Sequence, residues 1–212
     1  MTYFHLKFFA AICMVIDHIG FVFYPEESLF RIIGRLSFPV FAWLLAQGER
    51  KTHNIYAYIR RLAIAALISQ PFYSWLFEIR QLNILITLML GLVVIRLARQ
   101  FPTERYLLWA AGIFISALIP MDAGTYGLCV ILMMAEFPTQ KFSDVFRWWG
   151  LWISIHILDV VLLRQMLQLW ALPAPLLIYG LGQQRGPKAR WFYGFYPGHL
   201  AGLLLIKLQL LR

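Results

Sequence analysis

The sequence predicts an all-α fold, a polytopic transmembrane helix bundle of about 8–10 helices with its N-terminus in the cytoplasm. Three observations predict it: the composition, a succession of apolar runs of membrane-spanning length, and basic residues that recur in every second loop. Of the 212 residues, 61% are hydrophobic and 14% are charged, and the mean hydropathy is +0.68. Soluble domains are about half apolar and a quarter charged, so this chain cannot enclose its apolar surface in a water-facing globule.

The apolar runs follow one another along the whole chain, which we expect to form a single integral membrane domain over residues 1–212. A helix that crosses the hydrocarbon core needs about 20 residues. The expected spans are residues 6–24, 29–48, 57–77, 82–98, 105–120, 124–138, 145–163, 166–182 and 192–210. The junctions between them contain helix-breaking residues, namely Pro25, Pro102, Pro120, Pro138 and the Gly186-Pro187 pair.

Two of these runs need separate comment. The first, residues 6–24, contains Asp17 and His18 and is followed by many others, so we expect a retained span rather than a cleaved signal peptide. The run at 166–182 contains Pro173 and Pro175, which either kink the helix or make it re-entrant. With nine spans the C-terminus lies outside. If the 166–182 run does not cross the membrane, the C-terminus lies in the cytoplasm instead.

The basic residues indicate the orientation of the bundle. With a cytoplasmic N-terminus, thirteen of the 19 lysines and arginines fall at cytoplasmic ends, as the positive-inside rule requires. They are Lys7, Arg50, Lys51, Arg60, Arg61, Arg96, Arg99, Arg105, Lys141, Arg147, Arg185, Lys188 and Arg190. The net charge of +9 is therefore a topology signal, and we expect no nucleic-acid partner. The two cysteines lie in apolar runs, and no residue spacing suggests a metal site.

Ionisable residues inside a span are costly, so they are candidates for function. Asp17 in the first run can be neutralised by Arg31 or Arg35 in the second, two arginines that lie four residues apart on one helix face. Asp17 belongs either to a structural ion pair or to a functional site. Two arginines for one carboxylate leave one cation for an anionic group or a developing oxyanion.

Two histidines lie at membrane depth, His18 and His199. Histidine can take and release a proton near neutral pH, so His18 can serve as a general base. Asp17 is badly placed to orient it, because adjacent helix positions point about 100° apart; Asp122 lies at a compatible depth. His199 follows Pro197 and Gly198, where a helix can open beside a site. Alternatively, each histidine hydrogen-bonds across a helix interface, and His156 pairs with Asp159 three residues along.

Further polar residues are candidates for binding. Asn83 and Thr87 open one run on a common face and either join helices or line a path for a substrate arm. Arg60 and Arg61, with other cytoplasmic cations, set topology and can also hold the phosphates of a soluble cofactor.

Several motifs, in order along the chain, resemble the TraX family of F-pilin acetylases. The resemblance extends from Leu6 to about Leu204 and is weakest between Lys141 and Pro187. The motifs are Asp17-His18-Ile19-Gly20, Arg31 to Ala42, Tyr58 to Leu62, Ala66 to Phe72, Asn83 to Leu88, Gly91-Leu92, Asp122 with Tyr126-Gly127, and Phe192 to Leu200.

The resemblance implies an acetyl-CoA-dependent N-acetyltransferase of the inner membrane. Such an enzyme would acetylate the N-terminal amine of a pilin or similar secreted peptide. A distant similarity to CoA-dependent transmembrane acyltransferases makes a surface glycan hydroxyl an alternative acceptor. The other partner is membrane lipid, and no metal is expected. A proton-coupled permease and a non-enzymatic membrane assembly protein remain alternatives.

The corresponding mechanism assigns a role to each candidate residue. His18, oriented by Asp122, would be the base, and His199 would protonate the thiolate or position the acceptor. Arg31 or Arg35 would stabilise the oxyanion. The contacts to acetyl-CoA would come from Arg31, Arg60, Arg61, Asn83 and Thr87.

Overall fold

The computed structural model describes residues 2–138, 142–180, 186–187 and 191–210. These ranges form ten α-helices and one 3₁₀ helix, and an isolated β-bridge joins Leu82 to Met121. The elements are α1 (Tyr3–Phe23), α2 (Ser28–Gly34), α3 (Ser37–Lys51), α4 (Ile55–Phe77), α5 (Ile84–Gln100), α6 (Arg105–Leu118), α7 (Gly124–Ala135), α8 (Phe142–Leu163), η1 (Met166–Ala171), α9 (Ala174–Gly180) and α10 (Phe192–Leu210). The all-α bundle is confirmed.

Each predicted span coincides with one helix or with a broken pair. The run at 29–48 is divided into α2 and α3 by a short turn at Arg35 and Leu36. The run at 166–182 begins as η1 and continues as α9, with Pro173 at the junction. Among the residues that the structure describes, three segments have the length and composition to cross a membrane: α1, the segment Ser28–Lys51 that comprises α2 and α3, and α8. The chain is therefore a membrane protein.

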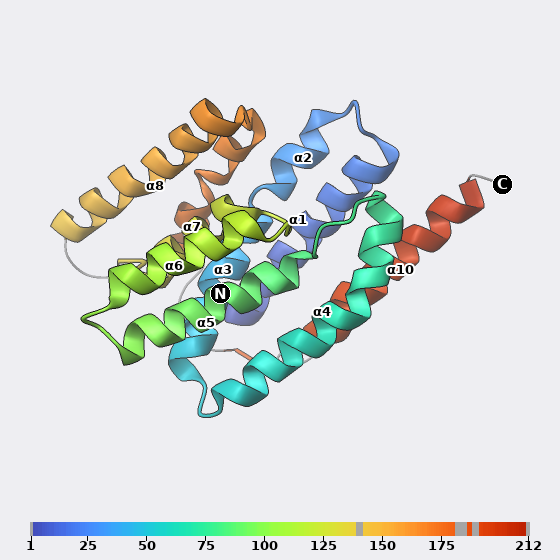
Figure 1. Cartoon of the computed structure of the whole chain (residues 1–212). Coiled ribbons are helices and arrows are strands. Elements are labelled where there is room, and N and C mark those ends of the chain that lie inside the picture. The colour runs from blue at the N-terminus through green and yellow to red at the C-terminus, as the bar shows by residue number, and fades with distance from the viewer. Residues whose placement is uncertain (1, 139–141, 181–185, 188–190, 211–212) are drawn as a thin grey trace.

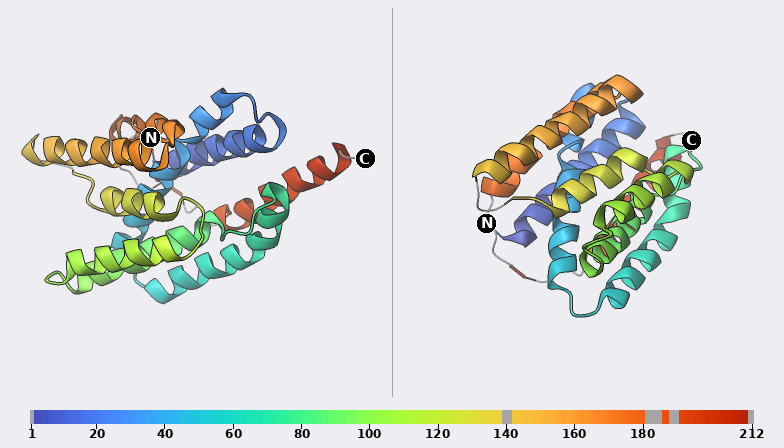
Figure 2. Two further views of the ribbon diagram at one scale, coloured as in Figure 1. Left: turned by 45° about the horizontal axis from the view of Figure 1, so that its top comes forward. Right: turned by 60° about the vertical axis from the view of Figure 1, so that its left-hand side comes forward.

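Helix α3 lies at the centre of the bundle. It packs against α1, α5, α7 and α9, while α4 packs against α5 and α10. Figure 1 shows α4 and α10 side by side along one edge of the bundle and α8 along the opposite edge. The two further views in Figure 2 show the same helices edge on, with α1 and α8 on one side of α3 and α4 and α5 on the other. Helices distant in sequence thus surround one core.

Basic residues from separate loops meet at one end of the bundle. Glu49, near the C-terminus of α3, forms ion pairs with Arg96 and Arg99 near the C-terminus of α5. Lys51 donates to the Tyr3 hydroxyl over 2.6 Å, which brings the start of α1 to the same end. These residues belong to the set predicted to face the cytoplasm; that side remains a prediction. Lys141, Arg185, Lys188 and Arg190 of that set, and the C-terminal Arg212, lie outside the described residues.

Small residues allow close helix packing in the core. A Cβ atom placed on Gly91 of α5 would lie 2.7 Å from the side chain of Ile131 on α7, which is fully buried. Such a separation is shorter than a van der Waals contact. The two helices can therefore pack this closely only because Gly91 has no side chain. Gly150 on the exposed face of α8 has no heavy atom within 4 Å of the same hypothetical atom.

We predict opposite effects for one extra methyl group at these two glycines. Gly91→Ala overpacks the α5–α7 contact and should destabilise the protein by about 1–3 kcal/mol. Gly150→Ala has free space and improves helix propensity, so it should leave stability unchanged or raise it slightly. Thermal unfolding of both purified variants in the same detergent measures the difference. Equal melting temperatures would contradict the packing argument.

Candidate active site

The polar residues that interrupt the spans converge on one cavity in the core. It has a volume of about 110 Å³ and is bordered by α1, the α2–α3 turn, α3, α5, the α6–α7 loop, α7, η1 and α10. Its polar lining residues are Asp17, His18, Arg35, Ser37, Asp122, Tyr126, Gln168 and Tyr196, and the rest of the lining is aliphatic and aromatic. We call it the site cavity. In the described part of the chain, no group of three or more His, Cys, Asp or Glu side chains is placed to hold a metal ion.

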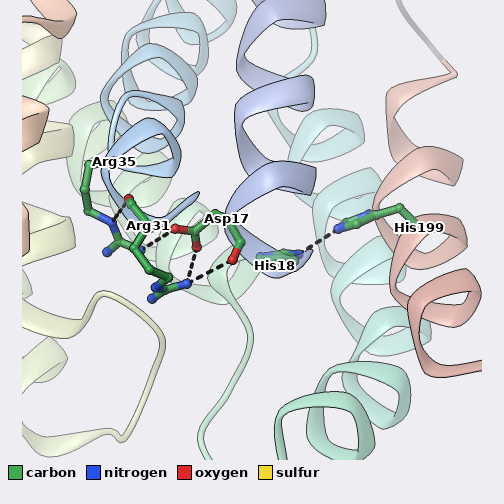
Figure 3. A network of polar contacts seen from close by, with 5 residues as sticks. All are labelled: Asp17, His18, Arg31, Arg35 and His199. Atoms are coloured by element: carbon green, nitrogen blue, oxygen red, sulfur yellow. Dashed lines mark hydrogen bonds and ion pairs between the residues drawn. The ribbon is translucent and has the colours of Figure 1, made fainter. Parts of the chain in front are cut away.

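His18 and His199 are hydrogen-bonded to one another. Nδ1 of His18 lies 2.9 Å from Nε2 of His199 (Figure 3), and Nδ1 of His199 lies 3.1 Å from the carbonyl oxygen of Phe195. A carbonyl can only accept, so Nδ1 of His199 carries a proton. In the neutral pair, Nε2 of His199 therefore accepts from Nδ1 of His18, and Nε2 of His18 keeps its lone pair. His199 stands behind His18 and orients it, the role that the sequence suggested for Asp122.

Asp17 binds both predicted arginines. Its two carboxylate oxygens lie 2.7 Å from a guanidinium nitrogen of Arg31 and 2.8 Å from one of Arg35. Arg31 also donates to the backbone oxygen of Asp17, and Nε of Arg35 donates to the backbone oxygen of Arg31. Figure 3 shows Asp17 and His18 leaving α1 in different directions, Asp17 toward the arginines and His18 toward α10. The carboxylate thus joins α1 to the broken second span.

Glycine allows the charged cluster to form. A Cβ atom on Gly34, the last residue of α2, would overlap the side chain of Asp17. Gly20 of α1 is similarly close to Phe30 of α2. Both glycines are needed for α1 and α2 to approach closely enough for a carboxylate to reach two guanidinium groups.

The loop between α6 and α7 positions Asp122. Leu82 donates to the carbonyl of Pro120 over 2.9 Å, and the Asp122 N–H donates to the carbonyl of Leu82 over 2.8 Å. Thr87 donates its hydroxyl to the Asp122 carbonyl at 2.5 Å. These bonds fix the loop beside the site cavity, where Asp122 lies within electrostatic range of Arg35.

Asn83 and Thr87 perform a structural task in this arrangement. Asn83 caps α5 by accepting from the Leu85 N–H, and its amide donates to the Ala66 carbonyl and to Gln70 at 2.8 Å each. Both side chains are fully buried, and neither lines the site cavity. Of the two roles that the sequence left open for them, the geometry matches the joining of helices.

A third histidine, His156, contacts Tyr126 of the cavity lining. Nδ1 of His156 lies 2.8 Å from the Trp152 carbonyl, so by the same reasoning its Nε2 accepts from the Tyr126 hydroxyl at 3.1 Å. The suggested pairing of His156 with Asp159 does not occur, and Oδ2 of Asp159 has no partner among the described residues. Sequence reasoning found no role for Tyr126 or Gln168, because no charge or spacing distinguishes them.

The site cavity continues toward the basic end of the bundle. A second cavity of about 60 Å³, the middle cavity, shares Phe41, Leu85, Leu88, Phe192 and Tyr196 with it. A third of about 210 Å³, the basic-end cavity, shares Lys7, Leu44 and Tyr58 with the middle one and is also lined by Lys51. Neighbouring cavities share lining residues, so the three lie one after another between Lys51 and His18.

Of the arginines predicted to bind phosphate, only Arg61 lies beside these cavities. The Arg61 guanidinium lies over the rings of Tyr58 and Tyr193, both of which line the middle cavity. Arg60 is exposed and lines none of the three cavities, and Arg31 is directed to Asp17 rather than into them. Lys7, which the sequence singled out only as a topology signal, lines two of them.

Comparisons with known proteins give three findings. The family described as TraX protein matches residues 4–207. The chain is 27% identical, over 98% of its length and 96% of the relative's, to "Probable fimbrial assembly protein FimC, serogroup H1" of Dichelobacter nodosus. It is 40% identical to an uncharacterised protein of Rickettsia prowazekii (strain Madrid E) over 41% of this chain, a match that spans 33% of that protein. No solved structure matches.

The family match covers nearly the whole chain, including every residue of the site cavity and of the His18–His199 pair. The chain therefore belongs to the TraX family.

Proposed function

We propose that this protein is a multi-pass inner-membrane acetyltransferase that transfers the acetyl group of acetyl-CoA to an amine. The observation that supports it most is the free lone pair on Nε2 of His18, in a buried cavity that also contains a guanidinium and a carboxylate. A base, a cation for a developing oxyanion and a counter-charge for an ammonium are the groups that acyl transfer to an amine requires.

The series of adjacent cavities suggests a route for the donor. Acetyl-CoA has an anionic nucleotide end and a long, narrow pantetheine arm that ends in the thioester. Lys51 and Lys7 at the basic end, with Arg61 nearby, suit the phosphates. The apolar middle cavity suits the arm and leads to His18. Lys7 and Lys51 thereby replace Arg60 as the first candidates for phosphate contacts.

The chemical step balances with the groups present. The acceptor ammonium first loses one proton, which Nε2 of His18 takes as its Nδ1 proton moves to Nε2 of His199, and the histidine pair then releases one proton to water. The free amine then attacks the thioester carbonyl, so that a C–N bond forms and the C–S bond breaks. The second nitrogen proton passes through His18 to the departing thiolate, giving amide and free CoA thiol. No covalent enzyme intermediate is needed.

Arg35 is the candidate for stabilising the oxyanion. It lines the site cavity, whereas Arg31 does not, although both bind Asp17. A guanidinium has five N–H donors, and the bonds to Asp17 and to the Arg31 carbonyl leave others for the carbonyl oxygen of the substrate. Asp17 and Arg31 then hold Arg35 in place.

The acceptor would reach the site from the end opposite the basic one. The α6–α7 loop and Gln168 border the site cavity there, and Asp122 supplies a negative charge suited to an ammonium group. The relative from Dichelobacter nodosus is named a fimbrial assembly protein, which supports a pilin-like peptide as acceptor. That name also supports a second candidate function, a non-enzymatic role in pilus assembly, in which acetyl-CoA would not be consumed.

Replacing the proposed base should abolish turnover without unfolding the protein. In His18→Ala we expect acetyl-CoA consumption with a peptide amine acceptor to fall about 10²–10⁴-fold, because general base catalysis contributes that much. His199→Gln should reduce the rate less and move its pH optimum, since it removes the relay but leaves the base. His53→Ala, an exposed loop histidine, is the matched control. Full activity in His18→Ala would refute the mechanism, and no turnover in the wild type would favour the assembly role.

Filling the middle cavity should block the donor. Ala65 lines this cavity and is buried in α4, so Ala65→Leu places an isobutyl group where the pantetheine arm would pass. Because the added atoms enter empty space, stability should be retained while the KM for acetyl-CoA rises at least about tenfold. Ala11→Leu, which fills a separate apolar groove between α1 and α10, is the control. An unchanged KM in a folded Ala65→Leu protein would exclude this route.

Of the two carboxylates of the site cavity, Asp17 should matter mainly for stability and Asp122 mainly for binding of the amine. Asp17→Asn leaves two partly buried arginines without their anion and should destabilise the protein by about 3–5 kcal/mol. Asp122→Asn breaks no ion pair among the described residues and should mainly raise the KM for the amine. Thermal unfolding and steady-state kinetics of both isosteric variants separate these roles. A larger stability loss in Asp122→Asn would reverse the assignment.

A further inference from the structure

A second cavity at the basic end lies outside the proposed acetyl-transfer path. It has a volume of about 250 Å³ and lies between the ends of α5, α6 and α7. Arg99, Arg105, Trp109 and Glu136 line it together with Pro102 and Ile95. It shares no lining residue with the site, middle or basic-end cavities.

The charges around this cavity do not cancel. Glu49 is almost fully buried and pairs with Arg96 and Arg99. A third arginine, Arg50, donates to the Ala135 carbonyl at the end of α7. The fourth, Arg105, is 3.9 Å from Glu136, which is too long for a hydrogen bond. Four arginines against two glutamates leave an excess of two positive charges within one cluster.

The position of the cavity relates it to the membrane surface. Helix α6 exposes large apolar side chains along its length, including Leu107, Phe114 and Leu118, as expected of a face in contact with lipid chains. At the N-terminal end of this face, the Arg105 guanidinium lies 4.8 Å from the ring centre of Tyr106 and 5.4 Å from that of Trp109. Aromatic and basic residues together mark the level of the lipid headgroups.

We propose that this cavity binds the phosphate group of an anionic phospholipid. Arg105 and Arg99 supply the forked N–H donors that match phosphate oxygens. Trp109 and Ile95 form an apolar wall for the adjoining glycerol and upper acyl chain. Glu136 is the opposing charge, because its carboxylate lines the same cavity and repels the phosphate. The inference is independent of the acetyl-transfer proposal, since it requires neither His18 nor acetyl-CoA.

Lipid binding to the purified full-length protein in detergent tests the proposal. Native mass spectrometry and thermal unfolding would compare phosphatidylglycerol with phosphatidylcholine of the same acyl chains. Phosphatidylglycerol should bind and stabilise the protein, and phosphatidylcholine should do so at least about tenfold more weakly, because its choline cancels the negative charge. Equal binding of the two lipids would overturn the proposal. Inorganic phosphate and CoA form the third arm; if these bind through Arg105 and phosphatidylglycerol does not, the lipid assignment is wrong.

Three charge variants distinguish a built site from general attraction to the basic end. Arg105→Gln should weaken phosphatidylglycerol binding about tenfold, the loss expected for one charge-assisted bond. Glu136→Gln removes the repelling carboxylate and should tighten binding. Arg147→Gln removes one charge from an exposed side chain in α8, which begins after the α7–α8 connection at the same end, and should leave binding unchanged. Equal weakening in Arg105→Gln and Arg147→Gln, or no gain in Glu136→Gln, would overturn the proposal.

Discussion

The bundle depends on one constraint: a charge inside an apolar medium must be paired. Asp17 satisfies it by binding Arg31 and Arg35 together. This fixes the first span to the second and holds both glycine-mediated contacts between α1 and α2 closed. It also holds Arg35 at the turn that divides the second span, beside the site cavity. The interaction that stabilises the helix pair is therefore also the one that places a guanidinium at the site.

Two adjacent residues of α1 have different partners: Asp17 anchors the helix to α2, and His18 is the base that we propose. Neighbouring helix positions point about 100° apart, so Asp17 faces α2 while His18 faces α10 (Figure 3). Anchoring through Asp17 thus determines the direction of His18 without a direct bond between the two side chains. The partner of His18 is in turn oriented by a backbone carbonyl of its own helix, so no carboxylate is needed to select the tautomer.

The sequence was sufficient for the fold and for part of the site. The positions of the helices follow from the apolar runs, and Asp17 with its two arginines follows from the cost of unpaired charge. The proline pair at 173 and 175 also indicated the irregular segment of η1 and α9. The helices and the proline break are local features of the sequence, and Arg31 and Arg35 are the nearest cations that can neutralise Asp17. The sequence pattern alone therefore predicts them.

Other parts of the site could not be predicted, because they depend on which helices become neighbours. The contact of His18 with His199 arises from the packing of α10 beside α1 and α4, and no spacing encodes it. Asn83 and Thr87 share a helix face as predicted, but that face meets α4 and the α6–α7 loop rather than a cavity. The sequence assigned Lys7, Lys51 and Arg60 alike to the cytoplasmic side. Only the structure shows that Lys7 and Lys51 line a cavity and that Arg60 does not.

The imidazole pair joins residues 181 positions apart, and this separation has a consequence for biogenesis. During synthesis, α1 enters the bilayer long before α10 emerges from the ribosome. Until then His18 has no acceptor for its Nδ1 proton, and its tautomer is unfixed. A nascent or truncated chain therefore lacks the partner that orients His18, the base that we propose, and the site is complete only when α10 has packed beside α1.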